Sequence, residues 1–99
     1  MFEISPAAGG LHLSGRFDAA AAASAEPHFE ALSGAAEVNM AALEYISSAG
    51  LGVLLKAHKR LAASGAGLRL VEVSPHIAEI LHFSGFDMLF EVVPASDPA

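Results

Sequence analysis

The sequence predicts an α/β fold whose elements follow the order β-β-α-β-α-β-α-β. Short runs that alternate apolar and polar residues are followed by stretches whose apolar residues recur three and four positions apart. Glycine, proline and serine stand at the boundaries between these segments. A length of 99 residues, 54% of them apolar, suits one core. We therefore expect a single domain over residues 1–99 with its core at about 2–93, partly parallel strand pairing, and helices covering the sheet.

Two short strands are expected near the N-terminus. Residues 2–4 and 11–14 alternate large apolar with polar side chains, and Gly9-Gly10 between them indicates a hairpin. Ser5-Pro6 is expected to end the first strand. Asp18 follows the second strand, in the position of a helix N-cap.

The helix that follows is rich in alanine, which has the highest helix propensity, but it contains Pro27. Proline is tolerated in a first helical turn and kinks a helix elsewhere. Two outcomes are open: a helix that restarts near Ser24, or a kinked helix that runs to Leu32. Ser33-Gly34 is expected to end it.

The middle of the chain predicts a central strand and an amphipathic helix. Residues 37–40 predict a strand that leads into residues 43–46, and the period becomes helical from Ser47. The expected apolar face of the helix consists of Leu51, Leu54, Leu55, His58, Leu61 and Ala62. The opposite, solvated face carries Lys56, Lys59 and Arg60.

The C-terminal part predicts one further strand, helix and strand. Residues 68–73 alternate as a strand, and Ser74-Pro75 supplies an N-cap and a first-turn proline for a helix that Gly85 ends. Residues 89–93 predict the last strand, and residues 94–99 a frayed tail.

The charge and composition argue against several functional classes. Five basic and 11 acidic residues give a net charge of -6, which disfavours binding to nucleic acid or anionic membranes. No run approaches the roughly 20 apolar residues of a membrane span, and the first residues show no signal-peptide pattern. The absence of cysteine excludes a disulfide framework or a thiolate metal site. We expect a cytoplasmic protein without metal or cofactor that binds a protein or small-molecule partner.

The segment from Tyr45 to Leu55 is the strongest candidate for a functional site. Ser47 and Ser48 fall where a strand ends and a helix begins, beside backbone N–H groups that have no intrahelical partner. The helix dipole favours an anion at the same place. Small residues after the serines leave room for another macromolecule to approach. An ordinary serine cap, with glycines for helix-sheet packing, is the plainer interpretation of the same pattern.

Catalytic motifs do not fit these serines. A nucleophile elbow needs glycine two positions before and after the serine, whereas Tyr45 and Ile46 occupy the preceding positions. The Gly50-x-Gly52 pair lacks the remaining glycine and the lysine of a phosphate-binding loop. His76 and Glu79 could share one helical turn, but no second such pair exists. We expect no enzymatic activity.

The segment Ile46-Ser47-Ser48-Ala49-Gly50-Leu51-Gly52-Val53-Leu54-Leu55 resembles the signature of the STAS domain, the module of sulphate transporters and anti-sigma factor antagonists. Leu13-Ser14-Gly15-Arg16-Phe17-Asp18 resembles its early Gly-x-x-Asp turn, and Val38-Asn39-Met40 its third strand. Ser74-Pro75 and Leu81-His82-Phe83-Ser84-Gly85-Phe86 resemble its last helix and the following turn. The likeness covers nearly the whole chain.

The resemblance implies a mixed sheet of four to five strands with helices mainly on one face. In stand-alone bacterial members, a serine at the start of the second helix is phosphorylated by a partner that is both an anti-sigma factor and an ATP-dependent serine kinase. The unphosphorylated form binds this partner and releases a sigma factor, and a phosphatase resets the switch. Aligning the motif puts the acceptor at Ser48. Ser47, a minor alternative acceptor, stands where the usual motif has aspartate.

Two expectations about partners follow from the resemblance. A small STAS subunit of an ABC-type lipid-transport complex, which binds its ATPase subunit, is the alternative function. For the antagonist, the expected partner surface consists of Asp18, Ser47, Ser48, Ala49, Gly50, Leu51, Lys56 and Lys59.

Overall fold

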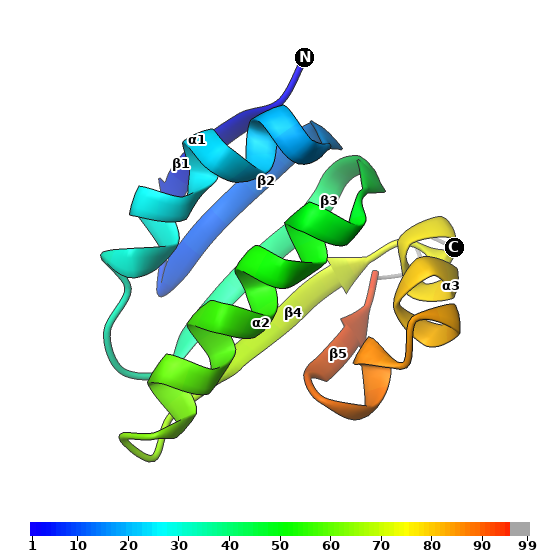
Figure 1. Cartoon of the computed structure of the whole chain (residues 1–99). Helices are drawn as coiled ribbons and strands as arrows, with labels where there is room; N and C mark the ends of the chain where they lie inside the picture. The colour runs from blue at the N-terminus through cyan, green and yellow to red at the C-terminus, as the bar shows by residue number, and fades with distance from the viewer. Residues whose placement is uncertain (96–99) are drawn as a thin grey trace.

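The computed structural model describes residues 1–95, which form a five-stranded sheet and three α-helices in the predicted order (Figure 1). The strands are β1 (Glu3–Ala7), β2 (Gly10–Phe17), β3 (Ala36–Ile46), β4 (Leu68–Val73) and β5 (Glu91–Pro94). The helices are α1 (Ala19–Glu30), α2 (Ser48–Ala62) and α3 (Pro75–Phe83), followed by a 3₁₀ turn, η1 (Phe86–Met88). The part of the expected tail at residues 96–99 lies outside the described residues.

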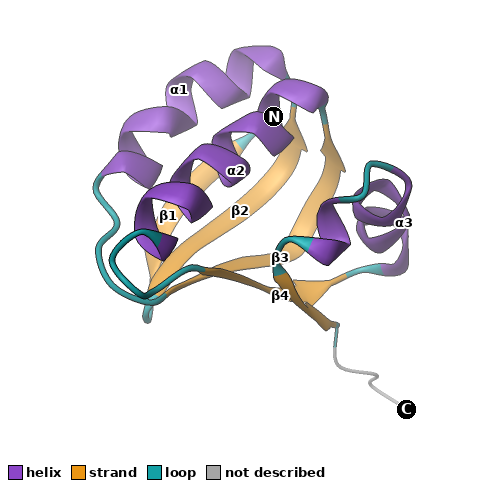
Figure 2. Cartoon of the chain, turned by 60° about the horizontal axis from the view of Figure 1, so that its bottom comes forward, coloured by secondary structure: helices purple, strands orange, loops and turns teal. Residues whose placement is uncertain are grey.

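The sheet has the strand order β1-β2-β3-β4-β5. β1 pairs antiparallel with β2, which confirms the hairpin, and the other neighbouring pairs are parallel. From β2 to β5, each strand is followed in the sheet by the next strand of the chain, and a helix lies between the two in sequence. Connections between parallel strands are nearly always right-handed, so all three helices are expected on the same face of the sheet. Figure 2 shows α1 and α2 over this face, and no helix of the described chain over the other. The prediction of a mixed sheet with helices mainly on one face is confirmed.

The core lies between the sheet and the helices. Alternate residues of β2 point into it, and Leu13 and Phe17 are fully buried. The Phe17 ring is stacked between Phe2 and Phe29, with ring centroids 5.0 and 6.3 Å away. Because Phe17 is the last residue of β2, this stack anchors the end of the strand from which the candidate site begins.

The first helix runs through Pro27, which excludes a helix that restarts near Ser24 and agrees with the alternative of a helix that continues toward Leu32. α1 begins at Ala19, and the Ser24 hydroxyl donates to the carbonyl of Ala21 within the helix instead of capping a new one. Pro27 falls in the last turn, where its missing N–H removes the hydrogen bond to the Ala23 carbonyl, but only three helical residues follow it. The buried side of α1 continues past Pro27 to Phe29, and the helix ends at Glu30.

The strands at the two edges also differ from the predictions. β1 continues through Pro6, which is tolerated because the strand lies at the edge of the sheet. The last strand was expected from residue 89, but η1 comes first and Phe90 enters the core, so β5 begins at Glu91. Pro94 pairs with Val73, which places it in the sheet and not in a tail.

The buried face of α2 is turned toward α1 relative to the prediction. Val53 and Ala57 are buried because α1 packs along this side of the helix, whereas Leu55, expected on the apolar face, is only half-buried. Ala62 is exposed. His58 is half-buried, its Nδ1 accepting a hydrogen bond from the Leu68 backbone N–H at 3.0 Å. His58 therefore packs on the side of α2 where it was predicted and is hydrogen-bonded there.

The open face of the sheet is polar. Arg69 on β4 donates to the carboxylates of Glu91 on β5 and Glu37 on β3, its partners in strand register. The hydrogen bond to Glu91 is the main cause that raises the pKa of Arg69 above its ordinary value, and Glu37 adds to it. This face therefore meets solvent through charged and polar side chains. The apolar side chains of the sheet point to the other face, which the helices cover.

Candidate functional site

The three helices begin at the carboxyl ends of parallel strands, and each is capped by the side chain before it. Asp18 accepts a hydrogen bond from the Ala21 N–H at 3.0 Å, which confirms its predicted role. Ser47 accepts from Gly50 N–H at 3.1 Å, and Ser74 caps α3 in the same way. These are the Asp and Ser residues that N-caps favour.

The ends of β2 and β3 bring the first two caps to one edge of the sheet. Phe17 and Ile46, the last residues of the two strands, are register partners. The Ser47 backbone N–H donates to the Phe17 carbonyl at 2.9 Å, which ties the start of α2 to the residue before Asp18. The structure thus brings Asp18 and the Ser47–Leu51 turn together, as the predicted partner surface requires.

The two serines have different environments. Ser47 is half-buried and its hydroxyl accepts the capping hydrogen bond. Ser48 is the first residue of α2 and is exposed, and within residues 1–95 its hydroxyl makes no hydrogen bond. The backbone N–H groups of Ser48 and Ala49 also have no acceptor in this part of the chain. A negatively charged group on Ser48 would meet unpaired donors and the positive end of the helix dipole.

Gly50 explains how closely α2 approaches β2. A Cβ atom at this position would lie 2.9 Å from the Phe17 carbonyl oxygen and 3.1 Å from an Ile46 side-chain carbon. Gly52 lies two residues further along, on the other side of α2, and a Cβ atom there would have no neighbour within 4 Å. Gly50 is therefore required by packing, whereas Gly52 faces solvent.

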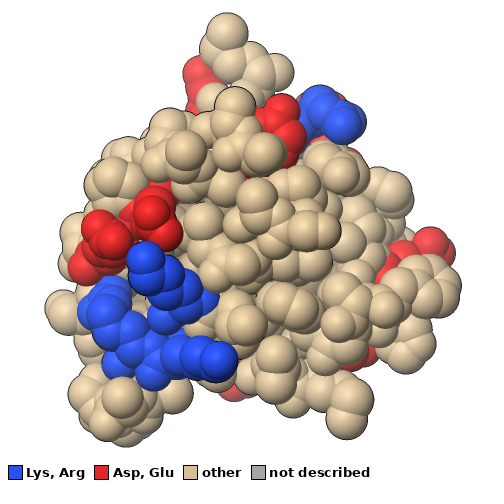
Figure 3. Space-filling model, viewed as in Figure 1, with Lys and Arg blue, Asp and Glu red and all other residues tan. Residues whose placement is uncertain are grey.

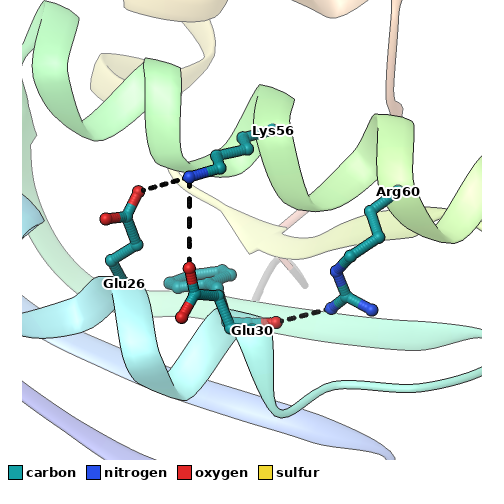
Figure 4. Close-up of polar contacts among 5 residues, drawn as sticks. Glu26, Glu30, Lys56 and Arg60 are labelled. Atoms are coloured by element: carbon teal, nitrogen blue, oxygen red, sulfur yellow. Dashed lines mark hydrogen bonds and ion pairs between the residues drawn. The ribbon is translucent and has the colours of Figure 1, made fainter.

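Lys56 and Lys59 lie apart from Ser48. Lys56 is eight positions further on, about 12 Å along the helix axis. Its Nζ lies 3.2 Å from a Glu26 carboxylate oxygen and 4.0 Å from one of Glu30, so it faces α1 (Figure 4). Lys59 is exposed. The predicted solvated basic face is only partly correct, and neither lysine adjoins the serine.

Arg60 has a role that the sequence analysis missed. Its guanidinium donates to the carbonyl oxygens of Phe29 at 2.9 Å and Leu32 at 2.8 Å, which caps the C-terminal end of α1. Both acceptors are backbone carbonyls, so no pattern of side chains in the sequence indicates this contact.

A hollow of about 430 Å³ opens beside Ser48, between the start of α2 and the later part of α3. It is lined by Tyr45, Ile46, Ser48, Leu51, Ile80, Phe83 and Ser84. Phe83 is 83% exposed, whereas Leu51 is buried. No residue of α3 was predicted at the site. α3 packs against the end of β3, which is distant from it in the sequence, and patterns within either segment do not indicate this contact.

The described residues show no other candidate for a chemical site. Within residues 1–95 no three histidine, aspartate or glutamate side chains gather as metal ligands would, and His76 and Glu79 stand without further ligands. No helix in the described part of the chain has the length and apolar character needed to cross a membrane.

We expect Ser47→Ala to lower the free energy of unfolding by about 1 kcal/mol, because Gly50 N–H loses its cap. Urea denaturation measures this change. Ser48→Ala is the matched control, since it removes an exposed hydroxyl that holds no hydrogen bond here, and its effect should stay within about 0.5 kcal/mol. Equal losses in the two variants would contradict the assignment of the cap to Ser47.

Comparison with known proteins agrees with this geometry. Residues 1–94 match the family model described as "Mlab, STAS domain". A Bordetella bronchiseptica protein, BtrV, named as a candidate anti-sigma factor antagonist, is 39% identical over 62 residues, which is 63% of this chain and 53% of BtrV. The chain thus spans about half the length of this curated relative.

Solved structures share the fold. An anti-sigma factor antagonist from Mycobacterium paratuberculosis has a TM-score of 0.76 at 22% identity, covering 95% of this chain and 85% of that chain. Unphosphorylated SpoIIAA has a TM-score of 0.67 at 16% identity, covering 97% and 90%. Phosphorylated Bacillus SpoIIAA has a TM-score of 0.64 at 18% identity, covering 93% and 90%.

The family match extends over nearly the whole chain, and the same sheet and helices recur in these antagonists. The chain belongs to the STAS domain family.

Proposed function

We propose that this protein is an anti-sigma factor antagonist that acts by binding, with phosphorylation of Ser48 as its control. The unphosphorylated form binds an anti-sigma factor that is also an ATP-dependent serine kinase, and so releases a sigma factor in the cytoplasm. A phosphatase resets the protein. The observation that supports the proposal most directly is the exposed, unbonded hydroxyl of Ser48 at the start of α2.

The local geometry favours Ser48 over Ser47 as the acceptor. Ser47 uses its hydroxyl in the helix cap and is half-buried, so its modification would break the cap. Ser48 lies free at the surface, beside N–H groups that a phosphate oxygen can accept from. Phosphorylation of Ser48 is therefore compatible with an intact fold.

The transfer itself needs only a reachable hydroxyl from this chain. The Ser48 oxygen attacks the γ-phosphorus of ATP, the bond to the β-phosphate oxygen breaks, and ADP leaves. The hydroxyl proton passes to a base of the kinase. The new group adds about -1.5 to -2 charge at pH 7.

Both forms of SpoIIAA resemble this chain in fold, which supports a switch that operates without refolding. The helix dipole accommodates the added charge on the antagonist, whereas a partner packed over Ser48 would have to accommodate its charge and bulk. The proposed partner surface includes Asp18 and the Ser47–Leu51 turn. Lys56, paired with α1, and Lys59 form its outer margin in this proposal.

Phosphopeptide mapping tests the acceptor. The purified protein is incubated with ATP and, one at a time, each serine-kinase anti-sigma factor encoded in the same genome. Wild type and Ser47→Ala should be phosphorylated, and Ser48→Ala should lose at least about 95% of the incorporated phosphate because no other serine in the turn is free. Equal labelling of Ser48→Ala would disprove the site.

A STAS subunit that binds the ATPase of an ABC-type lipid-transport complex is the second candidate. Two observations favour it: the matching family model is described as Mlab and not as an antagonist, and Ser47 replaces the aspartate that usually precedes the acceptor. This function requires constitutive binding. Co-purification with an ABC ATPase that Ser48→Asp leaves unchanged would support it over the switch.

A further inference from the structure

We propose that the hollow beside Ser48 receives an apolar side chain of the anti-sigma factor, with exposed Phe83 of α3 as the residue that determines affinity. This inference rests on the proposed function and adds α3 to the partner surface. It commits to one occupant, an uncharged side chain from the same partner that reaches Ser48.

The lining of the hollow has the chemistry of an apolar contact. None of its seven residues carries a charge, although the whole chain has 16 charged side chains other than histidine. The Ser84 hydroxyl is already bonded to the carbonyls of Ile80 and Leu81, at 2.9 and 3.0 Å, so it does not need a partner group. Ile46 and Leu51 supply apolar side chains next to Ser48.

Phe83 is unusually placed for a phenylalanine. It is 83% exposed at the end of α3, whereas Phe17, Phe29 and Phe90 are buried. An exposed aromatic ring at the rim of an apolar hollow gains free energy when a partner covers it, and aromatic residues at such positions often dominate binding.

Continuity with Ser48 identifies the occupant. Ser48 is itself part of the lining, so a protein that brings ATP to the Ser48 hydroxyl must also lie over the hollow. On this proposal, Ser48 and the hollow belong to one contact surface. When the partner docks, a phosphate at the edge of the hollow would lose its hydration and lie next to apolar groups. This desolvation costs free energy and disfavours the complex.

The charge distribution agrees with an uncharged contact. In Figure 3 most of the visible basic side chains gather over the C-terminal half of α2, next to acidic ones, and a further basic group lies with acidic ones near the top of the view. The middle of this face, toward α3, is free of charge. The basic cluster is Lys56, Lys59 and Arg60, of which Lys56 and Arg60 are paired with α1. The Arg16 guanidinium adjoins the lining, 4.5 Å from the centroid of the Tyr45 ring, but the hollow itself is lined by uncharged residues, so an uncharged partner side chain complements it.

Affinity measurements with matched variants test the inference. Phe83→Ser and Met88→Ser are compared with wild type by calorimetric titration against each purified serine-kinase anti-sigma factor of the same genome. Met88 is the control because it is 88% exposed on the neighbouring 3₁₀ turn but does not line the hollow. Both side chains are exposed, so neither change should disturb folding, and thermal unfolding checks this.

We expect Phe83→Ser to weaken binding about tenfold or more relative to wild type. Phe83→Leu keeps an apolar side chain and should retain most of the wild-type affinity. The affinity of Met88→Ser should stay within about twofold of wild type. If wild type binds and Ser48→Asp does not, but Phe83→Ser binds like wild type, the hollow is not part of the surface and this inference fails alone. Equal loss in Phe83→Ser and Met88→Ser would overturn it too. If no such kinase binds wild type, the proposed function itself fails.

Discussion

Replacing Ser48 by aspartate should weaken binding to the anti-sigma factor kinase at least about 100-fold while leaving the fold intact. The exposed position at the start of α2 places the new carboxylate beside the unpaired N–H groups, so the free protein tolerates it. In the complex, the same carboxylate would be covered by the partner at the edge of an uncharged hollow. A charge without a partner in such an interface costs several kcal/mol.

The matched control for this prediction is Ser33→Asp. It adds the same charge to an exposed residue in the loop between α1 and β3, at the end of β3 opposite to Ser48. Its affinity should remain within about twofold of wild type. Thermal unfolding should show Ser48→Asp as stable as wild type or more so, by about 0.3 to 1 kcal/mol from the helix dipole. Tight binding by Ser48→Asp would show that charge at this position does not control the partner.

The elements near the site could be predicted because their signals are local. Asp18, Ser47 and Ser74 were expected as caps from their places before helical periods, and each accepts the hydrogen bond that a cap requires. An N-cap hydrogen bond joins residues within one helical turn, so the local sequence is enough to predict it. The same holds for the βαβ order, since alternating periods of two and 3.6 residues are read along the chain.

Features that depend on contacts between distant segments could not be predicted in this way. Pro27 left two outcomes open, a helix that restarts near Ser24 or a kinked one that runs to Leu32, and the burial of Phe29 against the sheet favours a helix that continues past Pro27. Arg60 caps carbonyls about 30 residues away in sequence. Phe83 joins Ser48 at one hollow only because α3 returns beside the start of α2. The sequence therefore indicated the serine that is proposed as the acceptor but not the apolar surface beside it.

Two glycines in one helix should respond in opposite ways to the same substitution. Gly52→Ala should raise the free energy of unfolding by about 0.5 to 1 kcal/mol, because alanine has the higher helix propensity and its Cβ meets nothing. Gly50→Ala gains the same propensity, but its Cβ would lie 2.9 Å from the Phe17 carbonyl oxygen, a backbone atom held by the sheet. We expect a net loss of about 1 to 3 kcal/mol.

Urea denaturation of both variants measures the difference, which should be about 1.5 to 4 kcal/mol. Because α2 must move away from β2 to admit the new methyl group, Gly50→Ala should also displace the Ser48 turn. Phosphorylation by the kinase should therefore fall in Gly50→Ala and stay at the wild-type rate in Gly52→Ala, measured at a temperature where both are folded. Equal stability of the two variants would show that α2 can shift freely, and that the close approach at Gly50 does not hold Ser48 in place.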